Sequence, residues 1–177
     1  PKYDMKSLTV VGSEALVRWI HPTKGFIAPN DFIPLFEKNG FVLNIDRYMW
    51  EQACKAIRSW IDRGYKPVPI SVNVSRLHLS NEFFIDDLKD LIKKYQIPPE
   101  LLELELTESA GFEDFEKFLE IVNELKKQGF SIAMDDFGSG YSSLNMLRQI
   151  PCDILKLDRG FINDSTTDER GKIVVQH

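Results

Sequence analysis

The sequence predicts an α/β protein built on a parallel sheet, and the polar residues of its strands favour a closed (βα)₈-type barrel over an open, doubly wound sheet. Two observations carry this prediction. Strand-like alternation and helical spacing follow each other repeatedly, with short connections between them. In five predicted strands the polar residues share one face, and most lie near the C-terminal end of the strand, where an α/β barrel gathers its functional groups.

The predicted elements can be assigned in chain order. The spacing of Met49, Ala53 and Ile57 is helical, and Gly64 and Gly129 provide stops for two helices. The expected helices are 46–63, 84–95, 115–125, a short one through Leu144 and Leu147, and a last one that begins after Asp168. The expected strands are 14–19, 68–74, 101–106, 130–134 and 154–157.

Composition limits the function classes. The chain has 177 residues, 43% of them hydrophobic and 28% charged, which suits one globular domain with a sizeable core. The net charge of −5 and the lack of a basic stripe exclude duplex nucleic acid as an expected partner. An acidic protein that handled an anionic substrate would need cations to bridge the two.

The cysteines and the apolar runs predict a cytoplasmic domain. Cys54 and Cys152 lie far apart without metal-ligand spacing, so both are expected to be reduced packing residues. The chain has no apolar run of membrane-spanning length, and its start does not resemble a signal peptide.

The polar faces of the strands are the main functional signal. Residues two apart in a strand share a face, and in each strand the other face is apolar. The shared faces comprise Glu14, Leu16 and Arg18; Ser71, Asn73 and Ser75; Glu103, Glu105 and Thr107; Ser131, Ala133 and Asp135; and Lys156 and Asp158. We expect the apolar faces to pack against helices and the polar faces to converge at the mouth of a barrel.

Carboxylates that meet at one point repel one another unless cations neutralise them. The candidate ligands are Glu14, Asn73, Glu105, Asp135 and Asp136. Hard oxygen donors of this kind suit Mg²⁺ or Mn²⁺, and the set lacks the His and Cys that zinc prefers. The pattern alone leaves two interpretations open: a metal site, or separate carboxylates that cap helices and face solvent.

The adjacent pair Asp135 and Asp136 favours the metal site. One carboxylate of such a pair can bridge two metals while the other binds only the second, as in two-metal phosphoryl chemistry. The glycine-rich turn at 137–141 follows at once. It either brings backbone N–H groups to a phosphate or simply joins a strand to a helix.

Lys156 is unusual in the middle of a strand, because a lysine on a polar barrel face is costly unless it is paired or hydrated. Beside metals it could hold an attacking water or stabilise phosphate charge. The alternative is a structural salt bridge to Asp158 or Glu105.

Five segments together resemble the EAL domain family. They are Glu14-Ala-Leu-Val-Arg-Trp19, Ser71-Val-Asn-Val-Ser75, Glu105-Leu-Thr-Glu108, Asp135-Asp-Phe-Gly-Ser-Gly140 and Leu155-Lys-Leu-Asp158, and they follow the family's order at comparable spacing. Pro29, Phe32 and Ile33 resemble the segment after the family's first motif. The match covers essentially the whole chain.

The resemblance implies a modified TIM-type (βα)₈ barrel that hydrolyses cyclic di-GMP to linear pGpG with Mg²⁺ or Mn²⁺ in a two-metal site. The implied ligands are Glu14, Asn73, Glu105, Asp135, Asp136 and Asp158, with Asp135 shared by both metals. Lys156 resembles the lysine that contacts the catalytic water, and Glu108 the glutamate that steadies the loop after Asp135 and Asp136. Leu16 and Arg18 resemble substrate contacts, and Asp153 resembles an acidic residue near a guanine edge.

The resemblance also implies an incomplete barrel. The chain is expected to be one domain over 1–177, truncated at both ends and mainly at the C-terminal one, with about six strands. Two later strands of the family, with a late catalytic glutamate and a glutamine, have no counterpart after Asp158. We therefore expect a fragment that ends at His177 to be inactive, although the metal motifs that are present are intact.

Two rival functions remain. A degenerate domain of this family can bind cyclic di-GMP as a receptor without cleaving it, and a purely structural interaction domain would bind no nucleotide. The complete ligand set favours the enzyme. The resemblance further implies a homodimer, fusion to or regulation by sensory or diguanylate cyclase domains, and a parent protein that other domains could anchor to a membrane.

Overall fold

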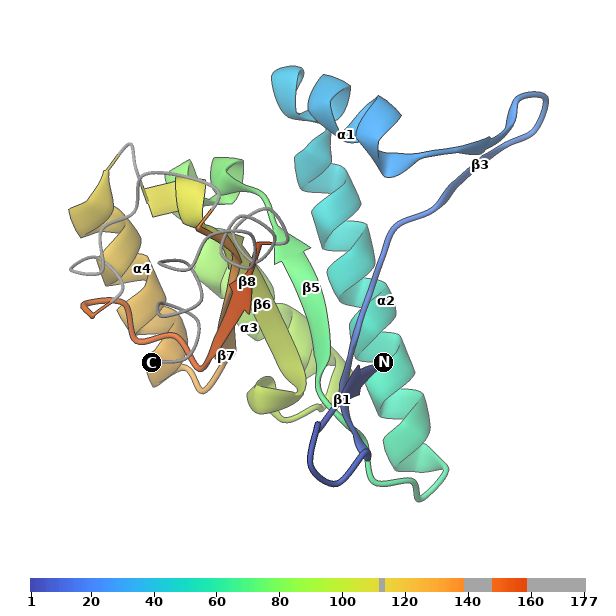
Figure 1. The fold of residues 1–177 in the computed structure, drawn as a ribbon, viewed down its shortest axis with the longest axis vertical. Coiled ribbons are helices and arrows are strands. Elements are labelled where there is room, and N and C mark those ends of the chain that lie inside the picture. Colours follow the sequence, from blue (N-terminus) through green and yellow to red (C-terminus); the bar gives the residue numbers. More distant parts are fainter. Residues whose placement is uncertain (112–113, 139–147, 159–177) are drawn as a thin grey trace, which may run out of the picture.

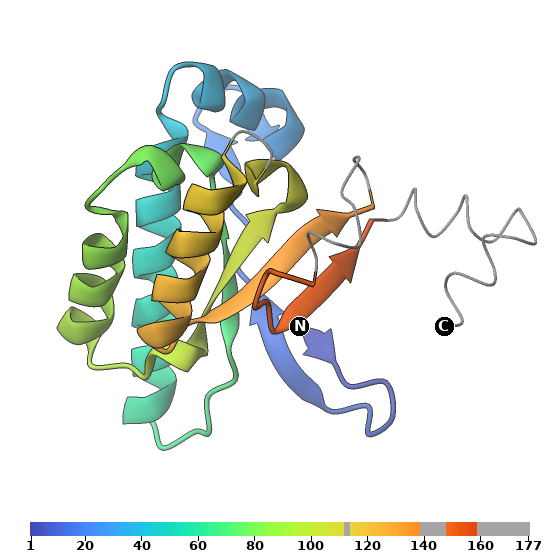
Figure 2. The same ribbon diagram turned by 90° about the vertical axis from the view of Figure 1, so that its left-hand side faces the viewer.

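A computed structural model describes residues 1–111, 114–138 and 148–158 of the chain. Its centre is a curled sheet in the strand order β1-β2-β5-β6-β7-β8 (Figure 2). β1 pairs with β2 in antiparallel fashion, and the other neighbours pair in parallel. The strands of this sheet are β1 (Lys2–Tyr3), β2 (Val10–Glu14), β5 (Ile70–Val74), β6 (Leu102–Thr107), β7 (Ser131–Phe137) and β8 (Ile154–Leu157).

The helices cover the outer face of the curled sheet, and the inner face is the concave side of an incomplete barrel (Figures 1 and 2). The helices are α1 (Pro29–Lys38), α2 (Val42–Asp62), α3 (Phe84–Tyr95) and α4 (Phe115–Lys127), with short 3₁₀ helices η1 (Arg76–Ser80), η2 (Pro99–Leu101) and η3 (Glu108–Gly111). The antiparallel pair β3 (Trp19–His21) and β4 (Gly25–Ile27) forms a separate hairpin that leads into α1. This arrangement confirms the predicted α/β fold of the modified, incomplete barrel type.

The outer face of the sheet makes the core. Leu102, Leu104 and Leu106 of β6 are fully buried against the helices, and Ile132 of β7 lies beside them. Each such side chain stabilises the fold by about 1.5–3 kcal/mol relative to an exposed one. The alternate apolar residues of each strand therefore determine which face of the sheet the helices cover. The polar residues between them face the inside of the barrel.

The predicted elements differ from the observed ones at several ends. The strand expected over 14–19 ends at Glu14, because the chain then leaves the sheet to form the β3–β4 hairpin. The helix expected from residue 46 begins at Val42, directly after the left-handed turn at Gly40. The strand at 154–157 is confirmed. The helices expected through Leu144 and Leu147 and after Asp168 lie outside the described residues.

Candidate active site at the mouth of the half-barrel

Strand register brings the predicted polar residues to one face of the sheet. Glu14 of β2 pairs with Ser71 of β5, and Asn73 of β5 pairs with Glu105 of β6. Thr107 at the end of β6 pairs with Asp135 of β7. Because the strands are parallel, their C-terminal ends lie at the same edge, and the candidate ligands gather there.

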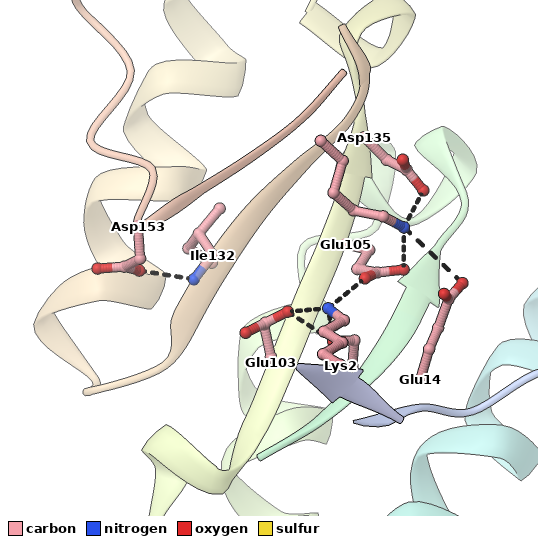
Figure 3. Close-up of polar contacts among 9 residues, drawn as sticks. Lys2, Glu14, Glu103, Glu105, Ile132, Asp135 and Asp153 are labelled. Atoms are coloured by element: carbon pink, nitrogen blue, oxygen red, sulfur yellow. Dashed lines mark hydrogen bonds and ion pairs between the residues drawn. The ribbon is translucent and has the colours of Figure 1, made fainter. Parts of the chain in front are cut away.

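Glu14, Glu105 and Asp135 point toward one place (Figure 3), and the Lys156 ammonium from β8 contacts all three carboxylates. This ammonium group donates to Asp135 Oδ2 at 2.7 Å and to Glu105 Oε2 at 3.1 Å, and Glu14 Oε1 is 3.8 Å away. Burial lowers the pKa of Lys156, but the hydrogen bonds to Asp135 and Glu105 outweigh burial and raise it overall. The salt bridge to Glu105 that the sequence left open is thus present, and the lysine also reaches a second strand-end carboxylate.

The electrostatics of the cluster are those of crowded carboxylates. Burial and the negative charges of Glu105 and Asp135 raise the pKa of Glu14. Burial and the charges of Asp135 and Asp158 raise the pKa of Asp136. Such shifts mark a place where additional positive charge would be bound favourably.

The donor set fits Mg²⁺ or Mn²⁺ in its chemistry, since carboxylate and amide oxygens are the preferred ligands of these ions. In the described part of the chain, no three acidic, His or Cys side chains are already arranged around one point as a metal site. The Lys156 ammonium stands between Glu105 and Asp135 instead. Binding of a metal ion would therefore require Lys156 to give up at least one of these contacts.

Asp135 and Asp136 lie in a bulge of β7. Met134 pairs with Leu155 and Phe137 pairs with Leu157, so two residues of β7 face one residue of β8. Asp136 has a φ of 55°, in the left-handed region that few residues other than glycine adopt. A regular strand would turn two neighbouring side chains to opposite faces. The bulge interrupts this alternation, and Asp136 lies close enough to Asp135 for the negative charge of Asp135 to raise its pKa. Backbone strain of this kind recurs at functional sites.

Glu108 lies beneath the start of the loop after β7. It is buried at the beginning of η3, and its Oε2 accepts a hydrogen bond of 2.8 Å from the backbone N–H of Gly138. Asp158 follows β8, and its backbone N–H donates to the Phe137 carbonyl at 3.0 Å. Both residues thus lie next to the acidic pair.

A cleft of about 420 Å³ opens beside the cluster. The predicted substrate contacts Leu16 and Arg18 line it together with Asn73, Pro29 and Ile33. Arg76, at the start of η1, also lines the cleft. Sequence reasoning missed Arg76, although a basic residue directly after the Asn73 motif was an available signal.

Asp153 lies at the wrong end of the sheet for its predicted contact with a guanine base. It precedes β8, so it lies at the N-terminal edge, away from the cluster (Figure 3). Its carboxylate accepts hydrogen bonds from Lys126 Nζ at 2.6 and 2.7 Å and from the Ile132 N–H at 2.8 Å. These contacts tie α4 to β7 and β8, and the prediction of a substrate contact is corrected accordingly.

Lys2 is the second residue that sequence reasoning missed. From β1 it reaches the interior face, where its ammonium donates to Glu103 Oε1 at 2.7 Å and Glu105 Oε1 at 3.0 Å and contacts Ser71 Oγ (Figure 3). Burial lowers the pKa of Lys2, but the bonds to Glu103 and Glu105 raise it overall. A strand of two residues has no periodicity, so only the unmatched charge of Glu103 in the strand interior could have indicated a nearby cation.

An incomplete α/β barrel with acidic strand ends, a lysine among them and an adjoining cleft defines a candidate hydrolase or ligand-binding domain of the barrel class. The sequence profile of the EAL domain matches residues 1–177. The chain therefore belongs to the EAL domain family.

Similar proteins support this membership. The chain is 38% identical to the bifunctional diguanylate cyclase/cyclic di-GMP phosphodiesterase MucR of Pseudomonas aeruginosa, over 99% of the chain and 26% of that protein. It is 36% identical to the cyclic di-GMP phosphodiesterase NbdA of the same species, over 92% of the chain and 21% of that protein. The chain thus spans about a quarter or less of the length of these relatives.

Solved structures agree with the fold. The phosphodiesterase of PaMucR in complex with c-di-GMP matches with a TM-score of 0.86 and 38% identity, over 94% of this chain and 68% of that one. The EAL enzyme Bd1971 with bound cAMP and cyclic di-GMP matches with a TM-score of 0.87 and 31% identity, over 98% of this chain and 48% of that one.

Proposed function

We propose that the complete domain to which this chain belongs hydrolyses cyclic di-GMP to linear pGpG with two Mg²⁺ or Mn²⁺ ions, and so lowers this second messenger in bacterial signalling. The observation that carries the proposal is the set of strand-end carboxylates around Lys156, beside a cleft, in a member of the EAL family. Relatives named as cyclic di-GMP phosphodiesterases cover almost the whole chain.

In this proposal Glu14, Asn73, Glu105 and Asp135 hold the first metal, and Asp135, Asp136 and Asp158 hold the second. Bound ions of this type neutralise phosphate charge and increase the acidity of a coordinated water. Asn73 is a neutral ligand, which limits the negative charge of the set. The strained bulge interrupts β7 at Asp135 and Asp136, and Glu108 holds the following loop through Gly138.

The chemical step is an in-line displacement at one phosphorus of the ring. The oxygen of a water molecule bonds to phosphorus, the bond from phosphorus to the 3′-oxygen breaks, and that oxygen leaves with a proton to become a hydroxyl group. The Lys156 ammonium would orient the attacking water. Arg18, at the cleft, binds a phosphate oxygen, and Leu16 packs against the nucleotide.

A direct assay of the full-length protein tests this function. Cyclic di-GMP is incubated with the protein and Mn²⁺ or Mg²⁺, and the products are separated by chromatography. We expect pGpG to form with either ion and to disappear with EDTA. Lack of pGpG formation with both ions, under conditions where cyclic di-GMP binds, would contradict the enzymatic function.

One observation favours a second candidate, a receptor that binds cyclic di-GMP without cleaving it. Lys156 places a positive charge of the protein itself against Glu105 and Asp135, and this charge partly neutralises the carboxylate cluster. Calorimetry in EDTA distinguishes the candidates: the receptor binds cyclic di-GMP and yields no pGpG when Mn²⁺ is restored. A structural interaction domain would give no binding heat in either condition.

The wider setting is also a proposal. MucR is named as a bifunctional diguanylate cyclase and phosphodiesterase, and by analogy this domain is fused to, or regulated by, a sensory or diguanylate cyclase domain. We further propose that it works as a homodimer in the cytoplasm. Among the described helices, none is both long enough and apolar enough to cross a bilayer.

A further inference from the structure

Two buried carboxylates lie side by side on the inner face of β6. Glu103 and Glu105 are two residues apart, so they share a face, and only 4% and 1% of their surfaces are exposed. Burial of two neighbouring negative charges is unfavourable unless a cation pairs with them. The interior of the half-barrel therefore needs a positive charge below the mouth.

Lys2 supplies this charge from β1, at the edge of the same sheet. β1 pairs with β2 so that Lys2 lies opposite Gly12. The lysine stem packs against this position, because a side-chain carbon added at Gly12 would lie in van der Waals contact with Lys2 Cδ, at 3.6 Å. The ammonium then joins Glu103, Glu105 and Ser71, which come from two different strands.

Lys2 and Lys156 each contact a different oxygen of the Glu105 carboxylate. Lys2 holds Oε1 at 3.0 Å, and Lys156 holds Oε2 at 3.1 Å. Lys156 also contacts Asp135, another candidate metal ligand, so a bound metal would compete with it directly. Within the described residues, the other polar partners of the Lys2 ammonium are Glu103 and Ser71. Neither is a candidate ligand, so these contacts can persist when metal binds.

We propose that Lys2 is a positioning residue for the metal site: it fixes Glu105 through Oε1 and presents Oε2 to the ion at the mouth. This inference rests on the proposed two-metal function. It assigns to the first strand a role in metal affinity, carried by a residue that is not itself a ligand. Residues that orient a metal ligand typically change metal affinity by about 10- to 100-fold when they are removed.

The test must separate positioning from charge. Lys2→Met alone makes the net charge near the ions more negative, takes the Lys2 ammonium from the buried Glu103, and leaves Glu105 with Lys156 alone. The double variant Lys2→Met/Glu103→Gln removes one positive and one negative charge, so the net charge of the site is unchanged. A matched control is Lys89→Met/Asp86→Asn, which removes an exposed ion pair of 2.9 Å on the outer helix α3.

The experiment titrates Mn²⁺ into the full-length wild type and both double variants, and follows free Mn²⁺ by its electron paramagnetic resonance signal. Circular dichroism checks folding. We expect Lys2→Met/Glu103→Gln to fold and to bind its tightest Mn²⁺ about tenfold more weakly than the wild type. The control should bind as the wild type does.

Wild-type Mn²⁺ affinity in the folded Lys2→Met/Glu103→Gln variant overturns the positioning role. Failure of this charge-balanced variant to fold also overturns it, and assigns Lys2 to the fold alone. If the wild type binds no Mn²⁺ at all, the proposed metal-dependent function fails, and this inference fails with it. The result for the wild type thus distinguishes the two failures.

Discussion

Trp50 of α2 donates its indole N–H to the backbone carbonyl of Asn73 at a distance of 3.0 Å. Asp46, one turn earlier on the same helix, accepts a hydrogen bond of 2.9 Å from the backbone N–H of Ser75. The helix thereby holds the end of β5 on both sides of its last residue. The candidate ligand Asn73 owes its position to a helix outside the sheet as well as to its own strand.

Replacement of Trp50 by Phe should weaken both the fold and the site. The change removes the indole N–H and takes a donor from the Asn73 carbonyl in a part-buried place, which costs about 1 kcal/mol of unfolding free energy. We expect a lower midpoint of thermal unfolding and a higher Mn²⁺ concentration for half-maximal hydrolysis.

Trp60→Phe is the matched control for this prediction. Trp60 lies on the same helix, and its indole makes no hydrogen bond to the part of the chain that the structure describes. If the two variants have the same Mn²⁺ requirement, the contact between Trp50 and Asn73 does not position the metal site.

Asp135→Asn should abolish hydrolysis of cyclic di-GMP by the full-length protein. Asp135 is the proposed ligand of both metals, and an amide cannot bridge two cations as a carboxylate does. The assay is pGpG formation at saturating Mn²⁺, with the exposed Asp87→Asn on α3 as the control. A rate within about tenfold of the parent, equivalent to about 1.4 kcal/mol of activation free energy, would contradict the two-metal assignment.

Much of the fold was predictable because burial follows the alternation of side chains in a strand. Leu102, Leu104 and Leu106 had to face helices, so Glu103 and Glu105 had to face inwards, and the structure agrees. The same alternation cannot reveal where a strand ends. Residues 15–18 continue the alternation of polar and apolar residues seen in β2, yet they leave the sheet and line a cleft.

The remaining errors have physical causes of two kinds. β1 is two residues long and is held by its partner β2 and by Lys2, so the sequence contains no local signal for it. Asp153 was placed near the substrate from a resemblance alone. Because it precedes the parallel strand β8, the strand direction already puts it at the edge opposite the mouth, and this signal was available.

Glu108→Gln should slow catalysis while the fold persists. The carboxylate accepts the Gly138 N–H at 2.8 Å from a buried position, and a hydrogen bond to a charged acceptor is worth about 1.5–3 kcal/mol, against about 1 for a neutral one. A looser loop after Asp136 should lower kcat by roughly tenfold. The exposed Glu120→Gln on α4 is the control. An unchanged kcat would show that the contact does not support the acidic pair.

The full-length protein should cleave cyclic di-GMP far faster than cyclic AMP or linear pGpG. The cleft at Leu16 and Arg18 adjoins Asn73 of the metal site, so a ring with two bases can fill it while one phosphate reaches the ions. Initial rates for the three nucleotides are compared at the same Mn²⁺ concentration. Comparable turnover of cyclic AMP would contradict the proposed specificity.

The ion pair of Asp153 should make stability depend on pH in a definite direction. Burial raises the pKa of Asp153, but the hydrogen bonds from Lys126 and the Ile132 N–H outweigh burial and bring the pKa below its ordinary value of 3.8. A carboxyl group whose pKa is lower in the folded state stabilises the fold above its unfolded pKa, and this contribution is lost as the pH falls through the folded pKa.

Asp153→Asn is therefore expected to reduce the free energy of unfolding at pH 7 by about 1 kcal/mol, since the carboxylate is partly exposed and solvent screens the pair. The difference between parent and variant should stay constant from pH 7 to about 5 and shrink as the pH falls below 3.8, where the parent also loses its charge. Urea unfolding at a series of pH values measures this difference in unfolding free energy. The rate of pGpG formation at pH 7 should be unchanged, because Asp153 lies far from the mouth of the half-barrel. A large loss of activity without a loss of stability would restore the substrate contact that the position of Asp153 argues against.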